Sequence, residues 1–230
     1  LLLTCDIALG VYLIAAFTAF NKPDESARIC TKVNIDIQDE ATNGFITTPE
    51  IKARLEKLNL YPMSKPLSKV NTRDIEDALK ESSFVRTAQC YKTDDGQVFI
   101  TLTQRMPTLR IKAANGDDYY LDDNNSIMPN SRYTSDLIVA TGNINRWYAR
   151  NYIAYVGKAL MANDFWNRQI VQINVLPNKG VELVPRVGDH IIYIGQLPET
   201  KYIADREKLV TKFINKKMHR LEMFYKYGLS

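Results

Sequence analysis

Residues 85–103 read VRTAQCYKTDDGQVFITLT and carry the clearest structural signal in the chain. Two runs of strand-forming residues, 85–92 and 97–103, flank an Asp-Gly pair at 95–96. Asp-Gly readily adopts the positive φ angles of a tight hairpin turn. The second run alternates apolar and polar residues, as a strand with one buried face does. This stretch therefore predicts an antiparallel β-hairpin.

The residues before the hairpin predict one further strand and two helices. Residues 33–37 alternate apolar and polar side chains, which is the period of a half-buried strand. Thr48 precedes Pro49, a pair typical of a helix that begins with Thr48 as its N-cap. A second helix is predicted from Thr72, with its apolar residues on one face. The order β-α-α-β-β predicts two helices on one face of a three-stranded sheet.

The residues after the hairpin predict a second part, so the chain has an α+β fold of two domains. Turn signals at Asn115-Gly116 and at 177–180 join alternating strands, and a strand is expected from His190 to Ile194. Residues 147–162 have helical periodicity, and a last helix mixes apolar residues with many Lys and Arg. We predict an antiparallel sheet with flanking helices over residues 108–230.

The N-terminal residues 1–20 are almost wholly apolar and have the length of a membrane span. Asp6 costs about 3 kcal/mol at a helix centre, whereas strongly apolar residues return about 0.3 to 0.6 kcal/mol each. Ten such residues in this run favour insertion. A cleaved signal peptide is the alternative, but no A-x-A cleavage pattern follows the run. We predict an uncleaved transmembrane helix, and because the chain begins at Leu1 we expect upstream residues to be missing.

Composition argues against nucleic-acid and metal sites. Charged residues make up 24% of the chain and the net charge is only +4, which is too balanced for a nucleic-acid-binding surface. The three cysteines and two histidines have no metal-ligand spacing. The acidic residues at 117–123 do not follow the spacing of a calcium-binding loop. We therefore predict no metal, no cofactor and no nucleic-acid partner.

Sequence motifs of catalysis are also missing. The chain has no G-x-S-x-G, H-E-x-x-H, Walker or G-x-G-x-x-G motif. We predict that the protein is not an enzyme. A cell-wall hydrolase that uses a pair of loop carboxylates is the enzymatic alternative, because sequence does not exclude such a pair.

Two cysteines fall in the same predicted sheet. Cys30 opens the first strand and Cys90 lies in another strand. An oxidising compartment could join them in a disulfide, and two small buried apolar residues are the other interpretation. Because the Cα separation that a disulfide needs is not given by sequence, both interpretations stay open.

Several sequence segments, taken in their order along the chain, resemble the bacterial cell-division family FtsQ, also called DivIB. Residues 102–111, LTQRMPTLRI, resemble the family's junction between its POTRA and β domains. Residues 119–125, YYLDDNN, resemble a family strand followed by an Asp-x-x-Gly turn, with Asn125 in place of Gly. NDFW at 163–166 resembles the segment after the family's middle helix. ELVPRVGDHIIYIG at 182–195 resembles its paired strands before the last helix, as in the Bacteroidetes branch.

The resemblance implies a single-pass protein of the bacterial inner membrane. It divides the chain into a transmembrane helix at 1–20, a linker at 21–29, a POTRA-like domain at 30–107 and a β-rich domain at 108–230. The family continues into a final strand, so we expect a terminal strand to be missing here. The implied function is a periplasmic, non-catalytic divisome scaffold that binds FtsB-like and FtsL-like proteins and helps control septal peptidoglycan synthesis. A POTRA-type outer-membrane assembly or secretion factor is the alternative.

We expect partners to bind by strand addition. An open sheet edge leaves backbone groups that an extended partner segment can pair with. The apolar, charge-free strand before the last helix suggests such an edge. The predicted partner-binding residues are Ile191, Ile192, Tyr193, Ile194, Lys208, Lys212, Phe224 and Tyr225. The basic residues of the last helix either meet an anionic partner or membrane surface, or form the solvated face of an amphipathic helix.

Overall fold

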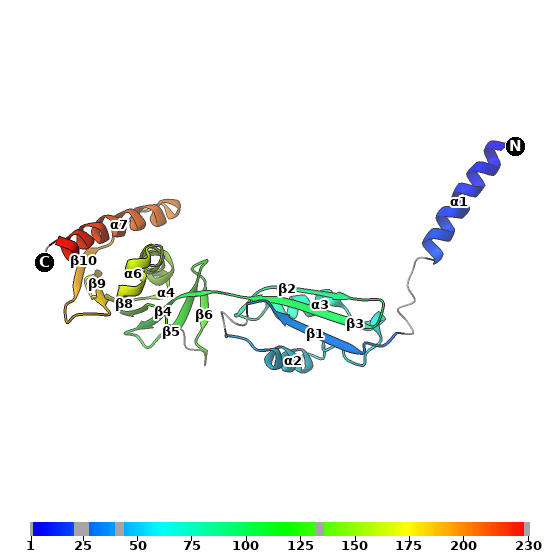
Figure 1. The fold of residues 1–230 in the computed structure, drawn as a ribbon, viewed down its shortest axis with the longest axis horizontal. Coiled ribbons are helices and arrows are strands. Elements are labelled where there is room, and N and C mark those ends of the chain that lie inside the picture. Colours follow the sequence, from blue (N-terminus) through cyan, green and yellow to red (C-terminus); the bar gives the residue numbers. More distant parts are fainter. Residues whose placement is uncertain (1, 21–27, 40–43, 132–135, 228–230) are drawn as a thin grey trace. The chain divides into compact units, whose positions relative to one another are not determined.

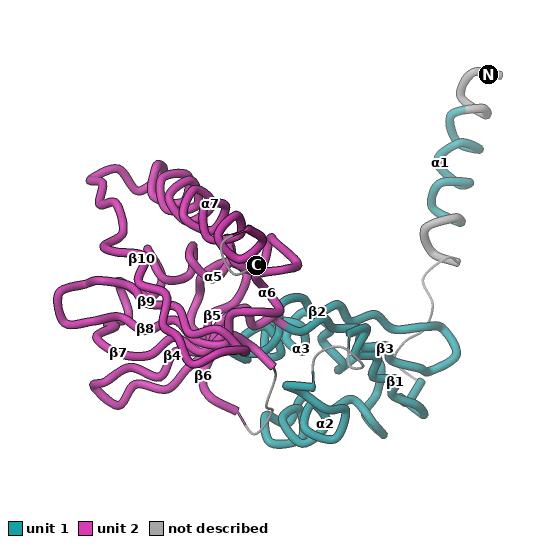
Figure 2. Tube along the Cα trace, turned by 60° about the vertical axis from the view of Figure 1, so that its left-hand side comes forward, with its two compact units in different colours: residues 1–104 teal, residues 105–230 magenta. Residues whose placement is uncertain are grey.

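The computed structural model describes residues 2–20, 28–39, 44–131 and 136–227 (Figure 1). The chain divides into two compact units, Leu1–Gln104 and Arg105–Ser230 (Figure 2). The first unit holds an N-terminal helix and a small sheet, and the second holds a larger sheet with most of the helices.

The apolar N-terminal run forms one helix, α1 (Leu2–Phe20). Side chains are described in it from Ile7 to Ala16, and most of them are exposed. Within the described ranges, no helix combines the length and the hydropathy needed to cross a bilayer. The transmembrane anchor thus stays a prediction, and the linker predicted at 21–29 falls mostly outside the described residues.

The first unit has the predicted β-α-α-β-β order. Its elements are β1 (Lys32–Ile37), α2 (Thr48–Lys57), a short 3-10 turn η1 (Leu67–Lys69), α3 (Thr72–Lys80), β2 (Val85–Lys92) and β3 (Gln97–Gln104). The strands lie in the order β1-β3-β2, with β1 parallel and β2 antiparallel to β3. The hairpin and the pair of helices predicted from sequence are confirmed.

The start of α2 corrects one detail of the sequence analysis. The N-cap is Thr47 and not Thr48. The Glu50 carboxylate accepts hydrogen bonds from the Thr47 backbone N–H at 2.9 Å and from its hydroxyl at 3.1 Å. Glu50 stands three residues after Thr47, which is the spacing of a capping box, and this pairing decides between the two adjacent threonines.

Helices α2 and α3 cover the same face of the smaller sheet. Alternate residues of β3 are fully buried, and they belong to one core with apolar residues of α2 and α3. Each such side chain contributes about 1.5 to 3 kcal/mol through burial. The core side chains are Val98, Ile100, Leu102, Ile51, Leu55, Ile75 and Leu79.

The second unit is built on a seven-stranded sheet with the order β10-β9-β8-β7-β4-β5-β6. Its strands are β4 (Pro107–Ala113), β5 (Asp118–Asp122), β6 (Ile127–Pro129), β7 (Val139–Gly142), β8 (Ile170–Val175), β9 (Gly180–Pro185) and β10 (Ile192–Gln196). Its helices are α4 (Arg146–Tyr148), a π-helical turn η2 (Ala149–Ile153), α5 (Ala154–Met161), α6 (Asp164–Gln169) and α7 (Ile203–Tyr227).

The larger sheet is mixed, so the prediction of an antiparallel sheet is wrong at its centre. β7 pairs in parallel with both β4 and β8. The chain leaves β7, passes through α4, η2, α5 and α6, and returns as β8. A helical crossover of this kind returns the chain in the same direction, which makes the two strands parallel. The strands β8, β9 and β10 form the predicted antiparallel meander.

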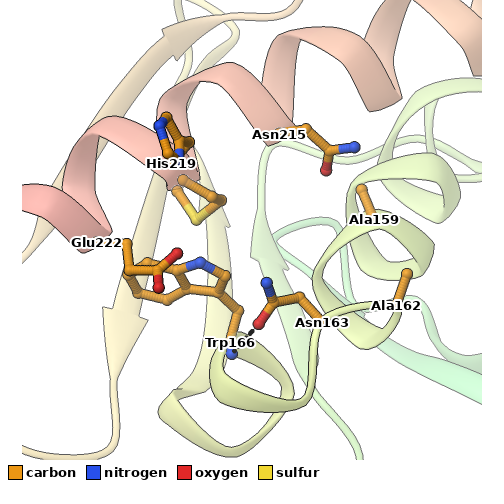
Figure 3. Close-up of a pocket in the computed structure, with 8 residues that line it drawn as sticks. Ala159, Ala162, Asn163, Trp166, Asn215, His219 and Glu222 are labelled. Carbon is orange, nitrogen blue, oxygen red and sulfur yellow. Dashed lines mark hydrogen bonds between the residues drawn. The ribbon is translucent and has the colours of Figure 1, made fainter.

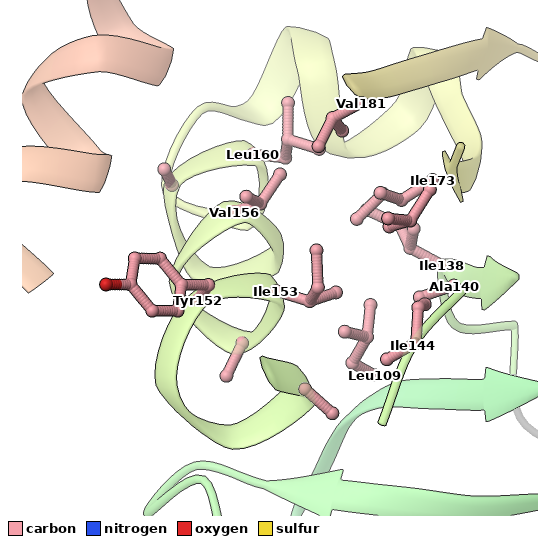
Figure 4. Packing of buried hydrophobic residues seen from close by; sticks show 14 of the residues in the cluster. Leu109, Ile138, Ala140, Ile144, Tyr152, Ile153, Val156, Leu160, Ile173 and Val181 are labelled. Carbon is pink, nitrogen blue, oxygen red and sulfur yellow. The ribbon is translucent and has the colours of Figure 1, made fainter. Parts of the chain in front are cut away.

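The core of the second unit lies between this sheet and the helix that follows β7. Ile153, Val156 and Leu160 point from the helix toward the strands (Figure 4). They meet buried residues of four strands, which are Leu109, Ala140, Ile173 and Val181. A Cβ on Gly157 would lie 3.2 Å from a methyl of Leu109, so the helix approaches β4 closely. This packing fixes the sheet against its helices.

The long helix α7 packs on α5 and η2 through Val210, Ile214 and Met218. Its first turn is held by Arg206, whose side chain is only 7% exposed. The Arg206 guanidinium lies 5.0 Å from the Trp147 ring centroid and donates a 2.6 Å hydrogen bond to Asn151 Oδ1. Cation–π and amide contacts therefore hold the start of α7 against η2.

The turn at Asp122 gives a testable consequence for Asn125, which has φ of +58°. Its Oδ1 is buried, with no hydrogen-bond partner in the described structure. We expect Asn125→Ala to lower the unfolding free energy by about 1 kcal/mol, because alanine is strained at positive φ. Asn125→Gly should stay within about 0.5 kcal/mol of the wild type. Urea unfolding followed by tryptophan fluorescence reports this unit, since Trp147 and Trp166 are the two tryptophans of the chain. Equal losses in both variants would contradict the expectation.

Candidate functional site

Strand β10 forms one edge of the larger sheet. It pairs with β9, and Ile192 faces Leu183 while Tyr193 faces Glu182. On its other side β10 has no strand partner in the described parts of the chain. The backbone groups on that side are therefore available to an extended segment of another chain.

A bulge limits how much of this edge is regular. The pairing with β9 shifts between Tyr193 and Gly195, and Gly195 has φ of +92°. Bulges twist an edge and interrupt further pairing, and natural sheets use them to protect edges. An added strand can therefore pair regularly only beside the residues up to Tyr193.

The four strand residues predicted to bind partners differ in exposure. Ile191 is 62% and Tyr193 is 57% exposed, whereas Ile192 is half-buried and Ile194 is buried in the core. The Tyr193 ring lies over Gly180 of β9, where a Cβ would come within 2.8 Å of it. Ile191 and Tyr193 can therefore contact a partner directly. Ile194 holds the strand against the core.

The C-terminal end of α7 lies beside the loop that leads into β10. The Tyr225 hydroxyl hydrogen-bonds His190 Nε2, and the two rings are 5.7 Å apart. Burial raises the pKa of Tyr225 above its usual range. Tyr225 also closes an apolar pocket of about 240 Å³, lined by Phe165, Trp166, Gln169, Pro185 and Val187. The pocket can take an apolar side chain of a bound segment.

The β10 edge belongs to the second unit, whose sequence matches a known protein family. Residues 106–230 match the family described as FtsQ/DivIB, C-terminal related, and this match covers more than half of the 230 residues. The chain belongs to the FtsQ/DivIB family. Residues 28–103 match the POTRA-like domain. No curated protein matches the chain. The family resemblance predicted from sequence is confirmed.

Membership in the FtsQ/DivIB family supports a role in bacterial cell division through interactions with other division proteins. Proteins of this family are membrane-anchored and are generally non-catalytic. Binding surfaces, rather than a catalytic centre, are therefore the features of this FtsQ/DivIB protein that need explanation.

The residues predicted on α7 fall in two separate places of this FtsQ/DivIB protein. Phe224, which is 56% exposed, and Tyr225 lie at the helix end, and the Tyr225 ring contacts His190 in the loop before β10. Lys212 and Lys208 come 13 and 17 residues before Tyr225, or about 20 to 25 Å away at the helical rise of about 1.5 Å per residue. The two lysines therefore do not belong to the β10 edge.

Sequence reasoning missed two exposed apolar residues near the edge. Val187 is 69% and Phe165 is 44% exposed, and both line the apolar pocket. A signal for Phe165 was present, because Asn163 caps α6 by accepting hydrogen bonds from the Phe165 and Trp166 backbone N–H groups. Neighbouring residues on a short helix point in different directions, so a buried Trp166 leaves Phe165 outside.

Three of the acidic residues singled out in the sequence are paired with arginines. Asp117, Asp118 and Asp122 form ion pairs with Arg146, Arg110 and Arg105, respectively. The arginine beside each carboxyl holds the pKa of Asp117 and of Asp118 below its usual range. No cluster of metal-ligating side chains occurs in the described parts of the chain.

Cys30 and Cys90 are buried free thiols in the structure. Burial raises the pKa of Cys90 to about 12, which makes this thiol a poor nucleophile at neutral pH. As free thiols, the two residues pack as small apolar side chains. Whether an oxidising compartment joins them stays a prediction.

Proposed function

We propose that this FtsQ/DivIB protein is a non-catalytic scaffold of the divisome. Residues 1–20 anchor it in the bacterial inner membrane, and the POTRA-like and β-rich domains at 30–230 lie in the periplasm. It binds FtsB-like and FtsL-like single-pass proteins and thereby helps control septal peptidoglycan synthesis. The unpaired edge of β10 is the observation that carries this proposal, together with the family membership.

The partner binds by adding a strand to β10. Its backbone pairs with the edge beside Ile191 to Tyr193, and its side chains contact Tyr193 and Phe224. An apolar residue of the same segment enters the pocket closed by Tyr225. Main-chain pairing supplies affinity, and the pocket and the exposed aromatic residues supply specificity.

The other sheet edges are less suited to this role. β6, at the opposite edge of the larger sheet, has three residues and ends in Pro129, which has no N–H to donate. In the smaller sheet, the edge strands carry charged residues such as Lys32 and Asp36 in β1 and Lys92 in β2. Charges and proline on an edge disfavour pairing. The start of β10 carries neither.

Two adjacent proline variants test this mechanism with an internal control. Neighbouring residues of a strand direct their N–H groups to opposite sides. One of Ile191→Pro and Ile192→Pro therefore removes a group that faces β9, and the other removes a group that faces the partner. We expect the variant that removes the partner-facing N–H group to fold like the wild type. It should bind the FtsB-like periplasmic segment at least about tenfold more weakly, a loss of about 1.4 kcal/mol.

The measurement is titration calorimetry with the FtsB-like segment of the same bacterium, alongside urea unfolding. Tyr193→Lys should also weaken binding, whereas Tyr202→Lys, which changes a tyrosine that is 72% exposed at the start of α7, should not. Unchanged affinity in both correctly folded proline variants would remove β10 from the binding site. Copurification with outer-membrane porins instead of division proteins would support the assembly-factor alternative.

A further inference from the structure

Helix α7 carries a concentration of positive charge that the β10 edge does not use. Residues 208–220 contain five Lys or Arg and no Asp or Glu, which gives +5. The whole chain has 30 basic and 26 acidic residues, or +4, so the rest of the chain sums to −1. Residues 208–220 therefore account for the whole net positive charge of the chain.

The basic side chains lie on the solvent side of α7. Lys208, Lys212, Lys216 and Arg220 are all exposed, and they repeat every four residues. Residues at this spacing follow one another along a helix face, so their charges form a continuous row. None of the four forms an ion pair with a carboxylate that the structure describes. The row is thus open to an anionic partner.

A hollow runs along the flank of α7 beside this row. One part, of about 250 Å³, lies between Asn215, His219 and Glu222 of α7 and Ala159, Ala162, Asn163 and Trp166 of α5 and α6 (Figure 3). A second, shallower part lies over the first half of α7 and shares Asn215. Both parts therefore border Asn215 of α7.

The residues of α7 that line the hollow have a regular spacing. Gaps of four, three, four, four and three residues separate Ala204, Lys208, Thr211, Asn215, His219 and Glu222. A repeat of about 3.5 residues is the seam along which a second helix packs lengthwise at a crossing angle of about 20°. Small residues on the seam and on the opposite wall allow a helix backbone to approach closely.

We propose that this flank of α7, from Ala204 to Glu222, is a docking surface for an acidic amphipathic helix of a partner protein. The partner places small and apolar residues along the seam and beside Ala162 of the opposite wall. Its Asp and Glu side chains face Lys208, Lys212 and Lys216. The surface spans the 19 residues from Ala204 to Glu222, or about 27 Å, which is the length of about five helical turns.

A protein helix fits this surface better than a lipid bilayer does. A helix that lies in a membrane surface needs an apolar face to insert. The apolar face of α7 is already buried through Val210, Ile214 and Met218. Among the described residues from Lys208 to Arg220, Leu209 is the exposed large apolar side chain, and it is only 38% exposed. This segment therefore has little apolar surface that could insert into a membrane. The partner must therefore supply both the helix and the acidic charge.

Two synthetic helical peptides of identical composition test this inference on the full chain. One carries alanine and leucine at the 3.5-residue seam with glutamate flanking it, and the other has the same residues scattered around the helix. We expect the patterned peptide to bind at least tenfold more tightly by fluorescence anisotropy, and its affinity to fall as salt is raised.

Variants on both walls locate the binding. Lys208→Glu/Lys212→Glu/Lys216→Glu reverses the row, and Lys57→Glu/Lys69→Glu/Lys112→Glu makes the same charge change at exposed lysines elsewhere. Ala162→Phe fills the hollow from an exposed position of its opposite wall. The row triple and Ala162→Phe should each abolish the preference for the patterned peptide, and the control triple should keep it.

Equal binding of the two peptides, or an equal loss in the control triple, would overturn the inference. A preference for phosphatidylglycerol vesicles over the patterned peptide would also overturn it and identify the row as a membrane contact. The proline variants at β10 should leave peptide binding unchanged. Failure of this surface is thus distinguishable from failure of the proposed strand addition.

Discussion

Gly142→Ala is expected to lower the unfolding free energy of the second unit by about 3 to 5 kcal/mol, through backbone strain and overpacking together. Gly142 has φ of +94°, and a Cβ there would lie 2.2 Å from the Val175 carbonyl oxygen and 2.8 Å from Asn174 Oδ1. A backbone carbonyl cannot move aside as the end of a flexible side chain can. The substitution must therefore displace β7 or β8.

The position of Gly142 gives this loss a functional consequence. Gly142 pairs with Ala113 of β4 on one side and with Val175 of β8 on the other. It thus joins the half of the sheet that carries β10 to the half built from β4, β5 and β6. A displaced β7 should weaken partner binding at β10 as well as stability.

Gly116→Ala is the matched control for this prediction. Gly116 has a similar φ of +90°, but no atom lies within 4 Å of the position its Cβ would take. We expect it to cost only the backbone strain of about 1 to 2 kcal/mol. Urea unfolding monitored by tryptophan fluorescence compares the two variants. A Gly142→Ala protein that is no less stable than Gly116→Ala would contradict the steric argument.

Asp122→Ala is expected to cost the same unit about 3 to 5 kcal/mol, because it removes a buried carboxylate that pairs with a guanidinium and with two backbone N–H groups. Asp122 is 2% exposed, and its Oδ2 accepts from Arg105 Nη2 at 2.8 Å. Its Oδ1 accepts from the backbone N–H groups of Asn124 at 3.0 Å and Ser126 at 2.6 Å. Removing the carboxylate therefore takes a hydrogen-bond acceptor from two backbone N–H groups and from a mostly buried guanidinium at once.

Two comparisons separate the charge of Asp122 from its hydrogen bonds. Asp122→Asn keeps an acceptor for the two amides and should lose less than the alanine variant. Asp136→Ala removes an exposed ion pair with Arg186, whose side chains are 87% and 52% exposed, and should cost at most about 1 kcal/mol. Equal urea midpoints for Asp122→Ala and Asp136→Ala would show that burial does not amplify this ion pair.

Local signals in the sequence predicted the first unit well. The Asp-Gly turn, the alternation in β3 and the threonine-proline start of α2 each depend on a few neighbouring residues. The error at the N-cap arose because two adjacent threonines offer the same side chain, and only the position of Glu50 distinguishes them. Strand β6 and helix α6 were missed because they have only three and six residues, which is too few to show a strand or helix period.

The larger sheet was less predictable because strand direction is a long-range property. An apolar strand such as β7 has the same pattern whether its neighbours are parallel or antiparallel. For the candidate site, the charge-free start of β10 was visible in the sequence. The bulge after Tyr193 and the distance between Lys208 and Tyr225 depend on how β10 and α7 fold. Sequence therefore grouped residues that belong to different surfaces.

The bulge in β10 also bears on self-association. If two copies of the chain met edge to edge, regular pairing would end after Tyr193 in each, and so short a ribbon is unstable in water. A foreign segment gains additional contacts in the pocket beside Tyr225, which an identical edge does not offer. The irregular strand thus discourages sheet-to-sheet polymerisation of this protein while it leaves room for a different chain.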